Sequence, residues 1–94
     1  GAMQRSAQLF AQLLPGYINK LLEAAVQQQT KELQSVAHKL KGAAAAVGLA
    51  WVMQQASTLE EQEPDWQGLQ RQLSELHFTA EQHLATLQQY IEQY

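Results

Sequence analysis

Apolar residues recur every three or four positions along most of this chain, which is the spacing of an amphipathic α-helix. The clearest run keeps that spacing for four turns. Thr30 stands before it as a possible N-cap, and Gly48 follows it as a terminator suited to the left-handed conformation. The pattern therefore predicts a helix between these two residues, with an inward stripe of Leu33, Val36, Ala37, Leu40, Ala44 and Val47.

Four other segments show the same periodicity, with apolar positions spread over residues 9–14, 17–25, 49–59 and 69–91. The first segment is short and ends at Pro15, whose fixed φ angle suits the first position of the next helix. Pro64 lies in a break before the last segment, and Asp65 is a possible N-cap for it. We therefore expect a short N-terminal helix followed by four substantial ones.

The composition favours helices throughout. Gln, Leu and Ala dominate, β-branched residues are sparse, and no segment alternates as a strand would. The connections between the predicted helices are short, which is typical of antiparallel neighbours. The expected fold is all-α: an antiparallel up-and-down four-helix bundle with an extra short N-terminal helix packed against it.

The size and charge of the chain restrict its function. Its 94 residues suit one domain, in which residues 1–3 resemble the remnant of a cleaved tag and residues 4–94 form the bundle. The absence of cysteine excludes disulfides and thiolate metal sites, and no apolar run reaches the roughly 18 residues of a membrane span. Six basic residues against nine acidic ones, with no basic run, indicate neither nucleic acid nor direct membrane contact. A protein or small-molecule partner is expected.

His38 occupies a position that core packing does not explain. It lies roughly 160° from the centre of the apolar stripe, near the middle of the predicted solvent-facing side. Gly42 follows one turn later, where neither a cap nor a kink is needed, although a glycine inside a helix costs about 0.5 to 1 kcal/mol relative to alanine. The glycine therefore indicates that this face needs space beside the histidine. The same face also holds Lys31, Gln34, Lys41 and Ala45.

A neutral imidazole on such a face can act as a nucleophile toward an anionic group. Lys41, three residues after His38, can neutralise charge on a phosphoryl group, and Gly42 lets a partner surface approach the ring. A solvated polar face in which these residues meet by chance is an equally good interpretation of the spacing alone. The spacing by itself leaves both interpretations open.

The other two histidines do not have the pattern of a metal site. His77 and His83 are six residues apart, so they lie on different faces of one helix, and no set of carboxylates or thiolates accompanies them. The sequence also lacks a Ser, His, Asp order, a Gly-rich phosphate loop and a nucleotide fingerprint. We therefore expect no metal, no bound cofactor and no autonomous ATP-dependent kinase activity.

The segment from Ala37 to Leu49 closely resembles the signature of histidine-containing phosphotransfer (HPt) domains. Its histidine is followed by Lys-Gly three and four residues on, then by small residues and an aliphatic-Gly-aliphatic close. Within that family the chain resembles the C-terminal domains of bacterial tripartite hybrid sensor histidine kinases, such as sensors of trimethylamine N-oxide. The resemblance implies a monomeric phosphorelay intermediate of a two-component system, in the cytoplasmic C-terminal part of a membrane-anchored sensor kinase.

The resemblance also implies roles for individual residues. His38 would accept a phosphoryl group on Nε2 from the aspartyl phosphate of a hybrid-kinase receiver domain, and would pass it to an aspartate of a response regulator. Lys41 would stabilise the phosphoryl charge, and Glu60 would orient the ring through Nδ1. The receiver domains would supply Mg²⁺. They would dock on a face made of Gly42, Ala45, Leu13 and Leu14, with Lys31 and Gln34 at its rim.

Two alternative functions fit the sequence less fully. A non-catalytic helical protein-docking module would bind a partner helix through the alanine-glycine face, with His38 incidental. The dimerisation domain of a histidine kinase also exposes a helical histidine, but Lys39 stands where such domains usually have an acidic residue. A four-helix pattern also needs no second chain to bury its stripes. A labile phosphate would argue against the first alternative, and a monomeric state would argue against the second.

Overall fold

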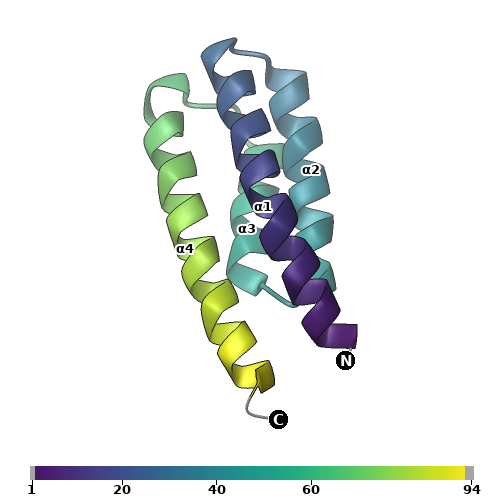
Figure 1. The fold of residues 1–94 in the computed structure, drawn as a ribbon. Coiled ribbons are helices and arrows are strands. Elements are labelled where there is room, and N and C mark those ends of the chain that lie inside the picture. Colours follow the sequence, from purple (N-terminus) through teal and green to yellow (C-terminus); the bar gives the residue numbers. More distant parts are fainter. Residues whose placement is uncertain (1, 93–94) are drawn as a thin grey trace.

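The computed structural model describes the backbone of residues 2–92 and the side chains of residues 5–90. It contains four antiparallel helices, α1 (Ala2–Val26), α2 (Thr30–Ala46), α3 (Ala50–Glu61) and α4 (Trp66–Glu92) (Figure 1). The chain runs up, down, up and down, so both termini lie at the same end of the bundle (Figure 1). The described residues include no strand. The predicted all-α up-and-down bundle is confirmed.

Each helix turns one apolar stripe toward a common core. Among the side chains of residues 5–90, every buried residue is hydrophobic. Helix α1 packs on α2 and α4, and α2 packs most extensively on α3, whereas α3 and α4 share the smallest contact. The best-buried large side chains are Leu14, Leu21, Leu33, Val36, Leu40, Val52, Leu69 and Leu73. The three-then-four spacing of the sequence thus becomes a continuous core, which fixes the exposed faces of α2 and α3.

The expected separation of a short N-terminal helix at Pro15 is absent, because α1 continues through this residue. Pro15 is exposed, while Leu14 and Ile18 on either side of it are buried. A proline inside a helix costs about 3 kcal/mol, and burial of a leucine or isoleucine side chain stabilises by about 1.5 to 3 kcal/mol. The two buried side chains offset the penalty, so tertiary packing overrides the local signal.

Gly48 ends α2 as predicted. Its φ of +73° lies in the left-handed region, and its backbone N–H donates to the carbonyl of Ala45. The N–H of Leu49 donates to the carbonyl of Ala44, which completes the paired hydrogen bonds of a Schellman motif. The chain reverses here in a tight turn, so α3 returns alongside α2.

The turn before α2 differs from the prediction at Thr30. The N-cap is Gln29, in an extended conformation and without a side-chain capping hydrogen bond, and Thr30 is the first helical residue. Gln28 adopts a φ of +53° and the N–H of Gln29 donates to the carbonyl of Ala24 at 2.9 Å, so this turn also has Schellman hydrogen bonding. Because this tight turn connects α1 directly to α2, the N-cap is Gln29, one residue before the threonine.

Candidate functional site

His38 lies on the outer face of α2, near the middle of the helix. The neighbouring Ala37 and Leu40 are fully buried and fix the rotation of α2 about its axis. The imidazole consequently projects outward, with a side-chain exposure of 67%. The position that the helical periodicity predicted for His38 is confirmed.

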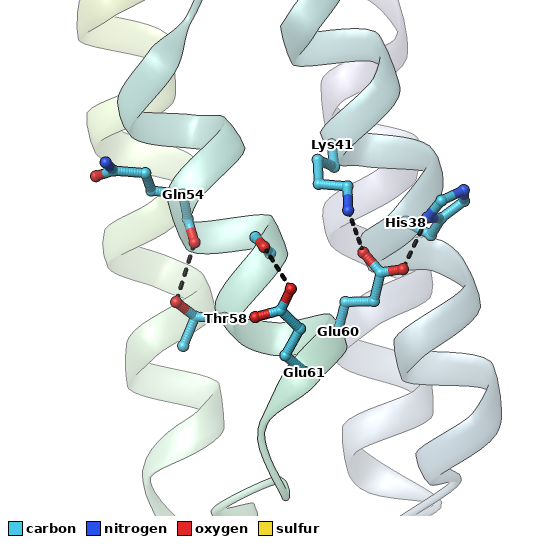
Figure 2. A network of polar contacts seen from close by, with 7 residues as sticks. His38, Lys41, Gln54, Thr58, Glu60 and Glu61 are labelled. Atoms are coloured by element: carbon cyan, nitrogen blue, oxygen red, sulfur yellow. Dashed lines mark hydrogen bonds and ion pairs between the residues drawn. The ribbon is translucent and has the colours of Figure 1, made fainter.

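Glu60 approaches His38 from the last turn of α3. Ala56 and Leu59 are buried against the core, and this packing places Glu60 at the edge of α3 that faces α2. Its Oε1 lies 2.8 Å from Nδ1 of His38 with hydrogen-bond geometry, and its Oε2 lies 2.8 Å from Nζ of Lys41 (Figure 2). One carboxylate therefore joins both residues of α2, and the contact with His38 that the resemblance implied is present.

The hydrogen bond to Glu60 distinguishes the two nitrogens of the His38 ring. A carboxylate oxygen can only accept, so the neutral ring that makes this bond carries its proton on Nδ1. Figure 2 shows the other nitrogen, Nε2, on the side of the ring that faces away from Glu60. The neutral imidazole thus presents the lone pair of Nε2 to the surroundings.

His38, Lys41 and Glu60 form a polar cluster in which the charges of Lys41 and Glu60 stabilise each other. The contact with the Lys41 ammonium lowers the pKa of Glu60, and His38 contributes in the same direction, while partial burial opposes both. Glu60 in turn raises the pKa of Lys41 above 10.5, with a smaller contribution from Glu61. Near neutral pH the carboxylate is therefore ionised and can accept the Nδ1 proton.

A shallow groove of about 460 Å³ lies beside His38 and Glu60. Its other lining residues are Lys31, Gln34, Ser35 and Lys39. The sequence had placed Lys31 and Gln34 on this face, whereas Ser35 was missed as a site residue. Ser35 stands three residues before His38, so the same helical spacing contained the signal for it. The α2 side of this groove therefore carries two lysines and neutral polar side chains, and Glu60 lies on its α3 side.

The surface of α2 next to His38 has no large side chains at Gly42 and Ala45. Both are exposed, and a Cβ built on Gly42 would have no atom within 4 Å apart from the adjacent residues and the backbone of its own helix. The packing inside the bundle would therefore also accept a larger residue at this position. What the glycine provides is free space on the surface of α2. A partner surface can therefore come close to the imidazole on this side.

The α1 part of the predicted docking face needs a correction. Leu13 is 42% exposed, but Leu14 is only 1% exposed and belongs to the core. The continuous α1 turns Leu14 inward with Phe10 and Ile18, whereas the short separate helix of the prediction left its rotation undefined. Leu9, which is 55% exposed and one turn before Leu13, was missed. It would have been found had α1 been taken as one helix.

Leu9 and Leu13 line a small apolar notch of about 100 Å³ between α1 and α2. Ala43 and Ala46 form the opposite side of this notch. Ala46 is exposed and stands four residues, about one helical turn, after Gly42. The notch and the surface around Gly42 thus share one stretch of α2.

The other histidines lie on α4, away from this site. His77 Nε2 is 2.9 Å from Oε1 of Glu81 on the same helix, and the His83 ring makes an edge-on contact with Trp51 at a centroid distance of 5.7 Å. In the part of the chain that the structure describes, no three His, Asp or Glu residues come together as metal ligands would. No helix in that part is long and apolar enough to cross a membrane.

Comparison with known families agrees with this geometry. The Hpt domain family matches residues 5–94, so the chain belongs to that family. No curated protein and no solved structure matches the chain significantly. Hpt domains serve in phosphotransfer within two-component phosphorelays and interact with receiver domains of kinases and response regulators.

Proposed function

We propose that His38 is the phosphoacceptor of this Hpt domain and that Nε2 is the reacting atom. The supporting observation is the hydrogen bond between Nδ1 and Glu60, which leaves the Nε2 lone pair facing outward on an exposed ring. A positioned carboxylate that holds one ring nitrogen fixes which nitrogen is the nucleophile. The family supports phosphotransfer as the reaction, and the contact with Glu60 supports Nε2 as the reacting atom.

In the proposed step, the Nε2 lone pair attacks the phosphorus of an aspartyl phosphate on a receiver domain. A phosphorus–nitrogen bond forms as the phosphorus–oxygen bond to the aspartate breaks, and the electron pair returns to the aspartate as a carboxylate. The Nδ1 proton stays on the ring, which gains a positive charge that Glu60 balances. Transfer to a response-regulator aspartate is the reverse step on a second receiver.

Positioning and charge stabilisation, more than covalent apparatus, drive phosphoryl transfer. In this proposal Lys41 stabilises the phosphoryl oxygens, while the receiver holds Mg²⁺. Gly42 and Ala45 admit the receiver, Leu13 supplies apolar contact, and Lys31 and Gln34 form the rim. The chain acts as a monomer in the cytoplasmic part of a membrane-anchored sensor histidine kinase, and the isolated domain has no kinase activity toward ATP.

The test is transfer of label from a ³²P-phosphorylated receiver domain with Mg²⁺ to this chain. Label on the wild type that is lost in acid and kept in alkali, with none on His38→Gln, is the expected result. His77→Gln is the matched control, because it removes another histidine whose ring contacts a glutamate, and it should label as the wild type does. Equal labelling of His38→Gln would overturn the assignment. Failure of every form to label would favour a docking module without phosphate.

A further inference from the structure

Lys41 forms an ion pair with Glu60, the residue whose carboxylate accepts from Nδ1 of His38. Glu60 Oε2 is shielded from solvent, and the Lys41 ammonium 2.8 Å away is its charged partner. A carboxylate oxygen that water cannot reach is unfavourable when ionised unless a cation compensates it. Lys41 therefore keeps Glu60 ionised and in place.

The same contact also sets the direction of the other carboxylate oxygen. The two oxygens of a carboxylate are rigidly linked, so an ion pair at Oε2 restricts where Oε1 can lie. Oε1 is the atom that accepts from Nδ1 of His38. In the unphosphorylated protein, Lys41 thus acts on the imidazole through Glu60.

Phosphorylation changes the charges that Lys41 meets, if His38 is the phosphoacceptor as proposed above. The ring then carries one positive charge and the phosphoryl group up to two negative charges. Glu60 has a full cation in the ring itself and no longer depends on Lys41. Lys41 stands three residues from His38, within one helical turn on the same side, so its flexible side chain can reach a group on the ring.

From this geometry we infer that Lys41 exchanges partners during the relay: it is bound to Glu60 while His38 is free, and it moves to the phosphoryl group once Nε2 is phosphorylated. The exchange leaves an alternating row of charges, Lys41, phosphoryl group, imidazolium ring and Glu60, in which each neighbour has the opposite sign. Lys41 is therefore a positioning residue before transfer and a phosphoryl ligand after it.

The positioning role of Lys41 in the unphosphorylated protein is tested without any receiver domain. The measurement is ¹⁵N NMR of the neutral His38 ring in alkaline buffer. The wild type should be mainly the Nδ1–H tautomer. Lys41→Met should lower the ratio of Nδ1–H to Nε2–H by about fivefold, the change that matches the loss of one ordinary hydrogen bond. Lys41→Arg should restore most of it, because a cation again faces Glu60.

Lys39→Met is the matched control. Lys39 is exposed on the same helix and has no ion-pair partner within the described residues. Its loss removes the same charge near the site without touching Glu60, so the tautomer ratio should stay as in the wild type. An unchanged ratio in Lys41→Met would overturn the positioning role, whatever the outcome of labelling from a receiver.

The contact of Lys41 with the phosphoryl group is tested on protein phosphorylated by phosphoramidate, a small donor that requires no receiver. A ³¹P titration then gives the pKa of the phosphoryl group on His38. If Lys41 has moved to it, that pKa should rise by about one unit in Lys41→Met and change less in Lys39→Met, since a nearby cation favours the more ionised phosphoryl group. Equal values in the wild type and Lys41→Met would mean that Lys41 stays on Glu60, and the exchange would be wrong.

Discussion

His38 and His77 both place a ring nitrogen beside a glutamate oxygen, but the two pairs are assembled differently. His77 meets Glu81 one turn later on the same helix, through Nε2, at 2.9 Å. His38 meets Glu60, 22 residues away on another helix, through Nδ1, at 2.8 Å. The local pair follows from helix geometry alone. The pair between helices exists only because α3 packs against α2.

The two pairs leave different nitrogens available. The Nε2 of His77 is shielded from solvent, and its contact with Glu81 lacks hydrogen-bond geometry. The Nε2 of His38 belongs to a ring that is 67% exposed and held from the opposite side. The carboxylate on the same helix lies beside Nε2 of His77, whereas the carboxylate from the neighbouring helix holds Nδ1 of His38. If His38 is the phosphoacceptor as proposed, this difference leaves its Nε2 available for the reaction, whereas Nε2 of His77 is covered.

The largest expected effect comes from giving His38 the local partner that His77 has. Gly42→Glu places a carboxylate four residues after His38, as Glu81 follows His77, at a position where a Cβ meets no neighbouring side chain within 4 Å. The new side chain competes for the ring, repels the phosphoryl group and obstructs the receiver. Label transfer from a phosphorylated receiver should fall by about a hundredfold or more.

Gly42→Ala separates the effects of size and charge. An alanine adds no charge and fits the open space, so it should raise the free energy of unfolding by about 0.5 to 1 kcal/mol in urea denaturation. Its transfer rate should lie between the wild type and Gly42→Glu. Transfer by Gly42→Glu at the wild-type rate would contradict the view that the missing side chain keeps Nε2 accessible.

A smaller effect is expected from removing the carboxylate of Glu60. Glu60→Ala deletes the acceptor of the Nδ1 proton, and loss of a partner that orients a reactive imidazole typically costs about 10- to 100-fold in activity. Glu60→Gln keeps an accepting side-chain oxygen and should retain more of the rate. Single-turnover transfer from a phosphorylated receiver measures both.

Glu81→Ala is the matched control for these variants, because it removes the carboxylate of the other pair. Its transfer rate should equal that of the wild type. A loss as large as that of Glu60→Ala would place the effect in overall bundle stability and not in the orientation of the His38 ring.

The smallest effect is the pH dependence of stability that the Glu60 and Lys41 pair produces. Because the pKa of Glu60 is below its ordinary 4.5 in the folded protein, its contribution is complete above that pH and is lost as the pH falls through the folded value. Because the pKa of Lys41 is above 10.5, its contribution is complete below that pH and is lost as the pH rises through the folded value.

Urea denaturation of the wild type and Glu60→Gln, from about pH 3 to about pH 8, measures the acid limb of this dependence. The difference in the free energy of unfolding should be steady from about pH 5 upward and should diminish in more acidic buffer. A difference that does not change across this range would contradict the lowered pKa of Glu60.

Most of the fold could be predicted from the sequence, and the errors have local causes. The stripe on α2 correctly gave the rotation of His38, Lys41 and Gly42, because helical periodicity relates residues three or four apart. At Pro15 the local rule was overridden by the buried Leu14 and Ile18, and the same error assigned Leu14 to the surface. Leu9 and Ser35 were missed although their helical spacing from Leu13 and His38 was present in the sequence.

The sequence by itself determined which residues share a face of α2, since that depends only on the geometry of one helix. The tertiary structure alone decided that Glu60 Oε1 and Oε2 lie 2.8 Å from His38 and Lys41. That arrangement depends on how α3 is rotated and advanced along α2, which the packing of Ala56 and Leu59 sets. Resemblance to a family suggested the glutamate, but a distance between two helices comes from the shape of the core that separates them.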